Sequence, residues 1–475
     1  MLRQLSGEER RLLILEGSLY KAVFFLAWPM VIQSLMMILV GAVDMMMVGA
    51  LGSDAVGAVG MARQVIQIIG ISIMAVGVGS TATIARYYGY NDIKGAVNAT
   101  GQALYLLFLF SLIITTVGLV FSEGIMHLLG AEGDLLTLGT GYLQIFFAGS
   151  LFFLGNFTLR SIFQGTGDTK TPTQIDVATN LLNIALNYLL IFGVGPVPAL
   201  GVPGAALGSL LSRVFAFSVG LYALKHRGFY YIPSVKEFME LSTHKMKQIL
   251  RIGIPAALQG ITRSGGNIVV LGMIARTAAG NDAVSGYSVG LMVFAFALFP
   301  AQAVGKSAAT IIGMNLGAYQ KDRAEESGWK CTGMGMGIIA LFSLIVFIFA
   351  PQFIRLFVDD PEVVRIGASF VRILAVVEPI HAMGLILANA LHGAGETVVP
   401  FYISLLSWVI LRVPFAYFFA FGLGFQETGI WIGIAVTQVI QGVLTALKFR
   451  EGKWKDKEIT ESSSENFSSK VTGKA

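Results

Sequence analysis

Long apolar stretches, separated by short polar connections, run from about Val23 to Phe449. An apolar helix of about 20 residues, rising about 1.5 Å per residue, crosses a hydrocarbon layer about 30 Å thick. Ten-residue segments of alternating hydrophobicity, which are typical of membrane barrels, are missing from the sequence. The pattern therefore predicts an all-α membrane protein. We expect twelve transmembrane helices, at about residues 22–50, 55–85, 96–121, 136–163, 173–194, 200–224, 248–276, 283–313, 328–350, 364–391, 398–422 and 429–449.

Charged residues make up 13% of the chain, and their positions indicate an orientation. Counted over the arms, the alternate loops and the span ends beside them, Lys and Arg number 24 on the side of the two termini and three on the other side. In such proteins the cytoplasmic loops carry the excess of Lys and Arg. We therefore expect a multi-pass protein of the plasma (inner) membrane with both termini in the cytoplasm. The net charge of +5 follows from this topology, so we expect membrane lipid as a partner and no nucleic acid.

The two halves of the chain resemble each other. QGTGDTKTP at 164–172 matches HGAGETVVP at 392–400, and STATI at 80–84 matches SAATI at 307–311, with offsets of 228 and 227. Since each half holds an even number of spans, both copies enter the membrane from the same side and form a parallel repeat, which is typical of transporters. We expect two six-helix lobes around a central cavity that rock to give alternating access. The predicted parts are a cytoplasmic N-terminal arm (1–21), an N-lobe with spans 1–6 (22–224), a cytoplasmic linker (225–247), a C-lobe with spans 7–12 (248–449) and a disordered cytoplasmic tail (450–475).

One acid lies deep in the first predicted span. Asp44 stands in LVGAVDMMMVG at 39–49, nine residues before Ser53 and therefore about 13 Å from the outer end. An ionised, unpaired carboxylate there costs about 2.5 to 3.5 kcal/mol. A group that alternates between a charged and a neutral form can couple transport to an ion, so we interpret Asp44 as the coupling residue. A structural aspartate held by hydrogen bonds is the alternative.

A polar stripe follows one face of the fifth predicted span. Asp176, Asn180, Asn183 and Asn187 are separated by 4, 3 and 4 residues, which matches the turn of a helix. The stripe indicates ion ligands, above all Asn183 and Asn187. Interhelical hydrogen bonds, worth about 0.6 to 2 kcal/mol each, are the alternative for the asparagines. Asp176 is nearest the cytoplasmic end, where it could simply be solvated.

The second half is rich in basic side chains within its predicted spans. They are Arg263, Lys306, Arg372 and Arg412, against a single acid, Glu378. Arg372 is turned away from Glu378 on the tenth span, so a pair between these two is not favoured. The charged residues could form a buried ion-pair network that fixes the packing of the lobe, or line a cavity that admits anionic or amphiphilic substrates. His381, one turn after Glu378, is a second candidate proton site because imidazole titrates near neutral pH.

The sequence lacks the motifs of several other functions. A single cysteine excludes an internal disulfide and a Cys-based zinc site, and the five histidines show no paired metal spacing. The glycine clusters lack the strand, helix and lysine of a nucleotide-binding loop. We therefore expect neither an enzyme nor an ATP-driven pump, and no cofactor.

Three stretches have a distinctive order and spacing: PMVIQSLMMILVGAVDMMMVGALG at 29–52, RSIFQGTGDTKTP at 160–172 and GVPGAALGSLLSR at 201–213. Together they resemble the multidrug and toxic compound extrusion (MATE) transporters, closest to the branch similar to DNA-damage-inducible protein F. The resemblance implies export of small organic compounds, often cationic, in exchange for inward H⁺ or Na⁺, and we expect a monomer. A lipid or lipid-linked saccharide flippase is the alternative, and an intramembrane enzyme or a passive scaffold is a third hypothesis.

The resemblance also implies where ions and substrate bind. It assigns the coupling ion to Asp44, Asn183, Asn187 and Ser209, and we add Asn180 from the stripe. Na⁺ is the one metal ion expected at this site. The second carboxylate of the family's motif is replaced by an amide at Asn187, so Na⁺ should bind less tightly here than to a site with two carboxylates. One branch of the family carries an acid in span seven and another in span ten. The matching positions of this sequence hold Arg263 and His381 instead. The residues expected to line the substrate cavity are Gln33, Tyr142, Asn156, Asp176, Arg263, Glu378 and His381.

Overall fold

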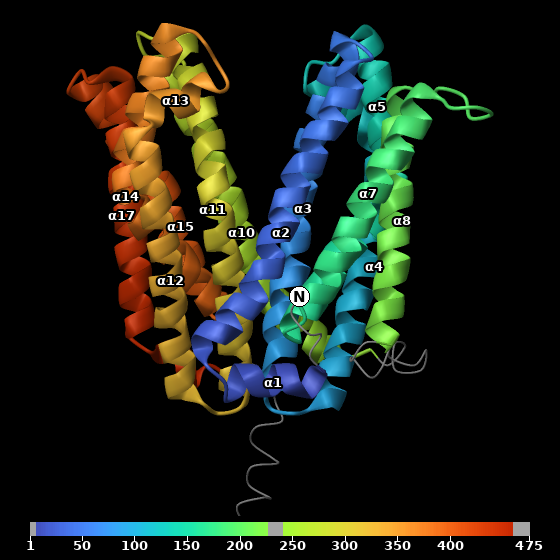
Figure 1. Cartoon of the computed structure of the whole chain (residues 1–475), viewed down its shortest axis with the longest axis vertical. Helices are drawn as coiled ribbons and strands as arrows, with labels where there is room; N and C mark the ends of the chain where they lie inside the picture. Colours follow the sequence, from blue (N-terminus) through green and yellow to red (C-terminus); the bar gives the residue numbers. More distant parts are fainter. Residues whose placement is uncertain (1–5, 227–240, 459–475) are drawn as a thin grey trace, which may run out of the picture. The chain divides into compact units, whose positions relative to one another are not determined.

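The computed structural model describes residues 6–226 and 241–458, without the side chain of Ala297. Every regular element in these two ranges is a helix (Figure 1). The first half contains α1 (Gly7–Leu15), α2 (Leu19–Gly49), α3 (Ser53–Gly89), α4 (Ile93–Leu128), α5 (Gly133–Ala148), α6 (Ser150–Gly165), α7 (Lys170–Phe192) and α8 (Val202–His226). The second contains α10 (Thr243–Ile274), α11 (Gly280–Gly317), α12 (Lys321–Ile348), α13 (Ala350–Arg355), α14 (Pro361–Gly393), α15 (Val398–Leu405), η1 (Leu406–Leu411), α16 (Arg412–Tyr417), η2 (Phe418–Gly422), α17 (Gln426–Arg450) and η3 (Lys453–Asp456).

The predicted membrane spans all fall on helices. Within the described ranges, nine continuous segments are long and apolar enough to cross a membrane, and two bent helix pairs raise the number to eleven. The remaining predicted span is α10, which is 32 residues long. The prediction of an all-helical protein with twelve spans is therefore confirmed.

Three spans depart from a straight α-helix. The fourth span bends by 55° between α5 and α6, and the eighth bends by 47° within α11. At the first bend, a Cβ atom on Gly149 would lie 2.2 Å from Leu210 Cδ1, so the missing side chain lets α8 approach the break. The eleventh span contains two π-helical stretches, η1 and η2.

The chain divides into two compact units, which differ from the predicted lobes at their limits. Unit 1 comprises residues 1–12 and 28–253, and unit 2 comprises residues 13–27 and 254–475. The first turns of α10 belong to unit 1 because small residues let the backbones of α10 and α3 come into contact there. A Cβ atom on Gly253 would lie 1.6 Å from the carbonyl oxygen of Ala75. The linker at 225–247 lies largely outside the described residues.

The packing within each unit is built on a few helices. In unit 1, α3 packs against α4, α5 and α6, while α7 packs along α8. In unit 2, α14 contacts α11, α12 and α17. The core of unit 2 contains an aromatic group in which Tyr287 stacks on Trp431 and Phe370 meets both rings edge-on.

Basic residues near the chain ends hold the two repeated loops. In unit 1, Asp168 accepts a hydrogen bond from the backbone N–H of Thr171 at 3.0 Å and pairs with Arg10 of α1 at 2.6 Å. In unit 2, Glu396 pairs with Lys457 at 2.8 Å. Each acid stands at the beginning of a membrane helix, so each ion pair fixes the entry of the chain into a span.

The tail predicted to be disordered is ordered in its first residues. Trp454 of η3 is buried, stacks on Phe449 with ring centroids 4.7 Å apart, and donates to the carbonyl oxygen of Phe449 at 2.7 Å. The prediction is wrong for 450–458 because this single aromatic side chain buries enough apolar area to anchor a polar segment. Residues 459–475 lie outside the described residues.

Candidate ion and substrate site

Asp44 lies at the meeting point of α2 and α7 in unit 1. The Asn187 amide donates a hydrogen bond to Asp44 Oδ1 at 2.8 Å. Asn187 is fully buried, whereas the Asp44 side chain keeps 16% of its surface exposed. A carboxylate that is partly exposed can still exchange a proton or a cation.

Asp44 also has a basic neighbour, which the sequence did not reveal. Arg63 of α3 places Nη2 at 3.5 Å from Asp44 Oδ2, a long contact for an ion pair, and also hydrogen-bonds to the hydroxyl of Tyr142. The Arg63 side chain is 35% exposed. The interpretation of Asp44 as an acid without a neighbouring base is therefore wrong, because α2 and α3 form a hairpin that brings the two side chains together.

The other predicted ion ligands extend the polar network beyond Asn187. The Asn183 amide nitrogen lies 3.4 Å from Asn187 Oδ1, 3.4 Å from Ser209 Oγ and 3.3 Å from Ser212 Oγ. The structure thus brings Asp44, Asn183, Asn187 and Ser209 together. Asn180 is buried one turn earlier on α7 and takes no part in this network.

Asp176 forms a second polar group nearer the start of α7. It is buried, pairs with Arg160 of α6 and accepts a hydrogen bond from Gln33 of α2. The expectation that Asp176 could be solvated is wrong. Arg213 of α8 interacts electrostatically with both Asp176 and Asp44, so it connects the two acidic groups.

Asn156, predicted to line the cavity, bonds to the backbones of two helices. Its amide nitrogen donates to the carbonyl oxygens of Phe152 at 2.7 Å and of Arg213 at 3.0 Å. These bonds tie α6 to α8 beside the acidic groups. Asn156 therefore holds the backbone that carries Arg213.

A third polar cluster lies inside unit 2. Glu378 is 1% exposed, and its Oε1 lies 3.0 Å from Nδ1 of His381. Arg412 is 2% exposed, stacks over the Trp408 ring at 3.7 Å and donates through Nε to Thr437 Oγ1 at 3.1 Å. Glu378 and Arg412 attract each other without direct contact. This cluster is far more enclosed than the group around Asp44.

The other basic residues of unit 2 are not equivalent to Arg412. Arg372 is exposed and donates to the carbonyl oxygen of Phe347 at 3.3 Å, in keeping with the expectation that it does not pair with Glu378. Arg263 is exposed within unit 2 and interacts repulsively with Arg412. The sequence predicted basic groups in this half, and the structure separates them into buried and accessible ones.

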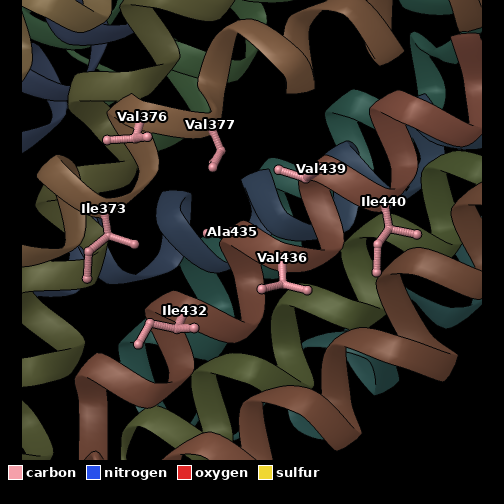
Figure 2. A pocket seen from close by; sticks show the side chains of 8 residues that line it. All are labelled: Ile373, Val376, Val377, Ile432, Ala435, Val436, Val439 and Ile440. Atoms are coloured by element: carbon pink, nitrogen blue, oxygen red, sulfur yellow. The ribbon is translucent and has the colours of Figure 1, made fainter.

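An apolar groove of about 490 Å³ runs between α14 and α17 (Figure 2). The lining residues are Ile373, Val376, Val377, Ile432, Ala435, Val436, Val439 and Ile440. None of these side chains is charged, so the groove offers nothing that could bind an ion or orient a charged substrate.

Among the described residues no group of three His, Cys, Asp or Glu side chains could hold a metal ion.

These features can be compared with known proteins. The family model MatE matches residues 29–189 and 255–418, and the two matched segments contain Asp44 and Glu378 respectively. The chain belongs to the MATE family. MATE proteins are membrane transporters for the efflux of drugs and other organic compounds, so this protein is an efflux transporter and not an enzyme.

Individual relatives agree with the family over most of the chain. A probable multidrug resistance protein NorM of Thermotoga maritima is 27% identical over 447 residues, which are 92% of this chain and 94% of the relative. An FAD transporter of Shewanella oneidensis is 28% identical over 385 residues, covering 78% and 82%. A solved multidrug resistance MATE transporter in an outward-facing conformation has a TM-score of 0.86 at 25% identity and covers 95% of this chain and 98% of its own. The narrower assignment to the branch resembling DNA-damage-inducible protein F stays a prediction.

Proposed function

We propose that this MATE protein exports organic compounds in exchange for an inward proton, and that Asp44 is the group that binds the proton. The observation that carries the proposal is the contact of Asp44 with Arg63 on one oxygen and with Asn187 on the other. When Asp44 is ionised, both neighbours stabilise its charge. Protonation removes that charge and weakens both contacts, so the packing of α2 against α3 and α7 depends on the proton.

Arg63 favours a proton over Na⁺ at this site. A guanidinium 3.5 Å from the carboxylate already neutralises it, and a sodium ion bound there would add a second positive charge. The amides of Asn183 and Asn187 can coordinate a cation through oxygen but add no negative charge. A proton adds the same charge, but it binds covalently to one carboxylate oxygen and needs no shell of several oxygen ligands, which Na⁺ would have to complete beside the guanidinium.

The direction of exchange follows from the proposed orientation. With both termini in the cytoplasm, Asp44 near the end of α2 is closer to the outer surface, from which the inward proton arrives. Voltage adds about 2.3 kcal/mol per charge and 100 mV to the driving force. We place the protein in the plasma membrane as a monomer in contact with lipid. The similarities to multidrug transporters do not favour the flippase.

The proposal is tested with the purified chain in proteoliposomes loaded with a dye, either cationic rhodamine 6G or anionic fluorescein. At fixed voltage in Na⁺-free buffer, we expect a proton gradient to drive dye movement, and Asp44→Asn to reduce the rate by about tenfold or more. Asp54→Asn, an exposed acid at the start of α3, is the matched control and should leave the rate unchanged. Loss of transport in Na⁺-free buffer, or full transport by Asp44→Asn, would contradict the proposal.

A further inference from the structure

Two guanidinium groups stand on packed helices of unit 2, and no described carboxylate contacts either of them. Arg263 and Arg412 repel each other electrostatically. Glu378 is the acid that interacts with Arg412, and its Oε1 contacts His381. In the part of the chain that the structure describes, no carboxylate oxygen reaches ion-pair distance of Arg263 or Arg412. The cluster thus has one positive charge more than its acid can balance.

Helix packing explains why these two arginines are neighbours. Gln259 of α10 donates to Ser404 Oγ at 2.8 Å, and a Cβ atom on Gly266 would lie 2.7 Å from the carbonyl oxygen of Trp408. Residues 259, 263 and 266 lie on one face of a helix, so Arg263 is on the face of α10 that packs against the eleventh span. Arg412 stacks on Trp408 in that same span.

The buried arginine also has a donor without an acceptor. Nη2 of Arg412 is buried and makes no hydrogen bond within the described ranges. A buried donor without a partner is unfavourable, and a buried cation without a balancing anion is more so. Arg263, in contrast, is exposed within unit 2 and can reach a solute. The pair therefore combines an accessible guanidinium with a second one that is fixed behind it.

We propose that Arg263 and Arg412 form a site for an oxyanion of the transported compound, so that the substrates include organic anions bearing a carboxylate or phosphate group. Arg263 makes the direct contact, because a guanidinium binds such groups through two parallel hydrogen bonds. Arg412 adds positive potential behind it. This inference rests on the proposed efflux function and names the substrate class. It assigns the substrate anion to unit 2 and the proton to unit 1.

An anionic substrate has an electrical consequence. Exchange of one inward proton for one outward monovalent anion moves two positive charges inward, so an inside-negative voltage contributes about 4.6 kcal/mol per 100 mV. Exchange of a proton for a monovalent cation moves no net charge. The voltage dependence of transport therefore distinguishes the two substrate classes.

The binding test uses the full chain in detergent and two xanthene dyes of similar size, anionic fluorescein and cationic rhodamine 6G, followed by fluorescence anisotropy. We expect fluorescein to bind at least about tenfold more tightly than rhodamine 6G. Arg263→Gln should weaken fluorescein binding about tenfold and leave rhodamine 6G unaffected, whereas Arg263→Lys should retain most of the affinity. Arg276→Gln, an exposed arginine just after α10, is the matched control and should change neither.

The outcomes separate this inference from the proposed function. If fluorescein binds through Arg263 but no proton gradient moves it, the anion site stands and the exchange mechanism fails. If a proton gradient moves rhodamine 6G, while fluorescein binds no better and Arg263→Gln has no effect, the exchange stands and the anion site is wrong. Voltage-independent transport of fluorescein would also overturn the anion site as a part of transport.

Discussion

Asp44 in unit 1 and Glu378 in unit 2 are both acids within membrane spans, but their surroundings differ. Asp44 has one oxygen held by Asn187 and the other near an arginine that is 35% exposed. Glu378 is 1% exposed and lies beside His381, with Arg412 buried nearby. A partly open acid can change its charge during a transport cycle, whereas an enclosed one contributes mainly to the packing of its unit. The comparison teaches that the two halves share a helical template but not their polar chemistry.

The repeat itself supports this difference. With the offset of 226 that relates Pro29 to Pro255, the counterpart of Asp44 is Val270, which is fully buried in the core of unit 2. The acid of the first span therefore has an apolar counterpart. The proposed coupling group thus has no acidic counterpart in the second half, and we expect substitutions in the two halves to have different kinds of effect.

The largest expected effect is on the stability of unit 2. Arg412→Met removes the stack on Trp408 and the hydrogen bond to Thr437, which should lower the unfolding free energy by about 2 to 4 kcal/mol. Arg63→Met, at a partly exposed arginine in unit 1, should change stability by about 1 kcal/mol or less. Circular dichroism during denaturation measures both variants. In addition, reaction of the buried Cys331 thiol with a fluorophore reports the opening of unit 2. Equal losses in the two variants would contradict the comparison.

A smaller effect is expected where α8 crosses Asn187. A Cβ atom on Gly208 would lie 2.2 Å from Asn187 Oδ1, so Gly208→Ala should displace the amide and weaken its bond to Asp44. We expect a loss of about 1 to 3 kcal/mol in stability together with slower proton-driven transport. Gly220→Ala, on the same helix, is the control, since its Cβ would meet only the flexible end of Leu159 at 2.8 Å. If both variants transport alike, the amide is not needed to hold Asp44.

The smallest expected change alters ion preference. Asn187→Asp places a second carboxylate beside Asp44 and raises the negative charge of the site. We expect Na⁺ to stimulate transport in this variant, with an apparent affinity at least about fivefold higher than in the original protein, or roughly 1 kcal/mol. Asn180→Asp, one helical turn before Asn183 on α7, is the matched control, and Na⁺ should not stimulate its transport. Transport by both variants is measured against Na⁺ concentration at fixed pH. An unchanged Na⁺ response in Asn187→Asp would contradict the assignment of the ion site to Asp44 and Asn187.

Much of the fold could be predicted because hydropathy is a local property of the sequence. The spans followed from apolar runs, and the spacing of Asp176, Asn183 and Asn187 correctly indicated one helix face, which the structure buries. The break at Gly149 could not be predicted in this way, since it depends on the approach of Leu210 from another helix.

The partners of the acids were harder to predict for the same reason. Arg63 lies 19 residues from Asp44, and only the hairpin between α2 and α3 makes them neighbours. A signal was present, because Arg63 and Arg213 stand in apolar runs where a charge is unfavourable unless it has a role. The sequence thus reveals which charges are unusual, and the fold determines which of them meet.

The ion pairs of the repeated loops differ in where their bases stand along the chain. Asp168 and Glu396 occupy matching positions in the two copies, yet Arg10 precedes the first six spans and Lys457 follows the last six. The acid of each loop follows the repeat, whereas its basic partner does not. Equivalent loops are thus held by a segment before the repeat in one half and by a segment after it in the other, so loss of one ion pair should leave the other in place.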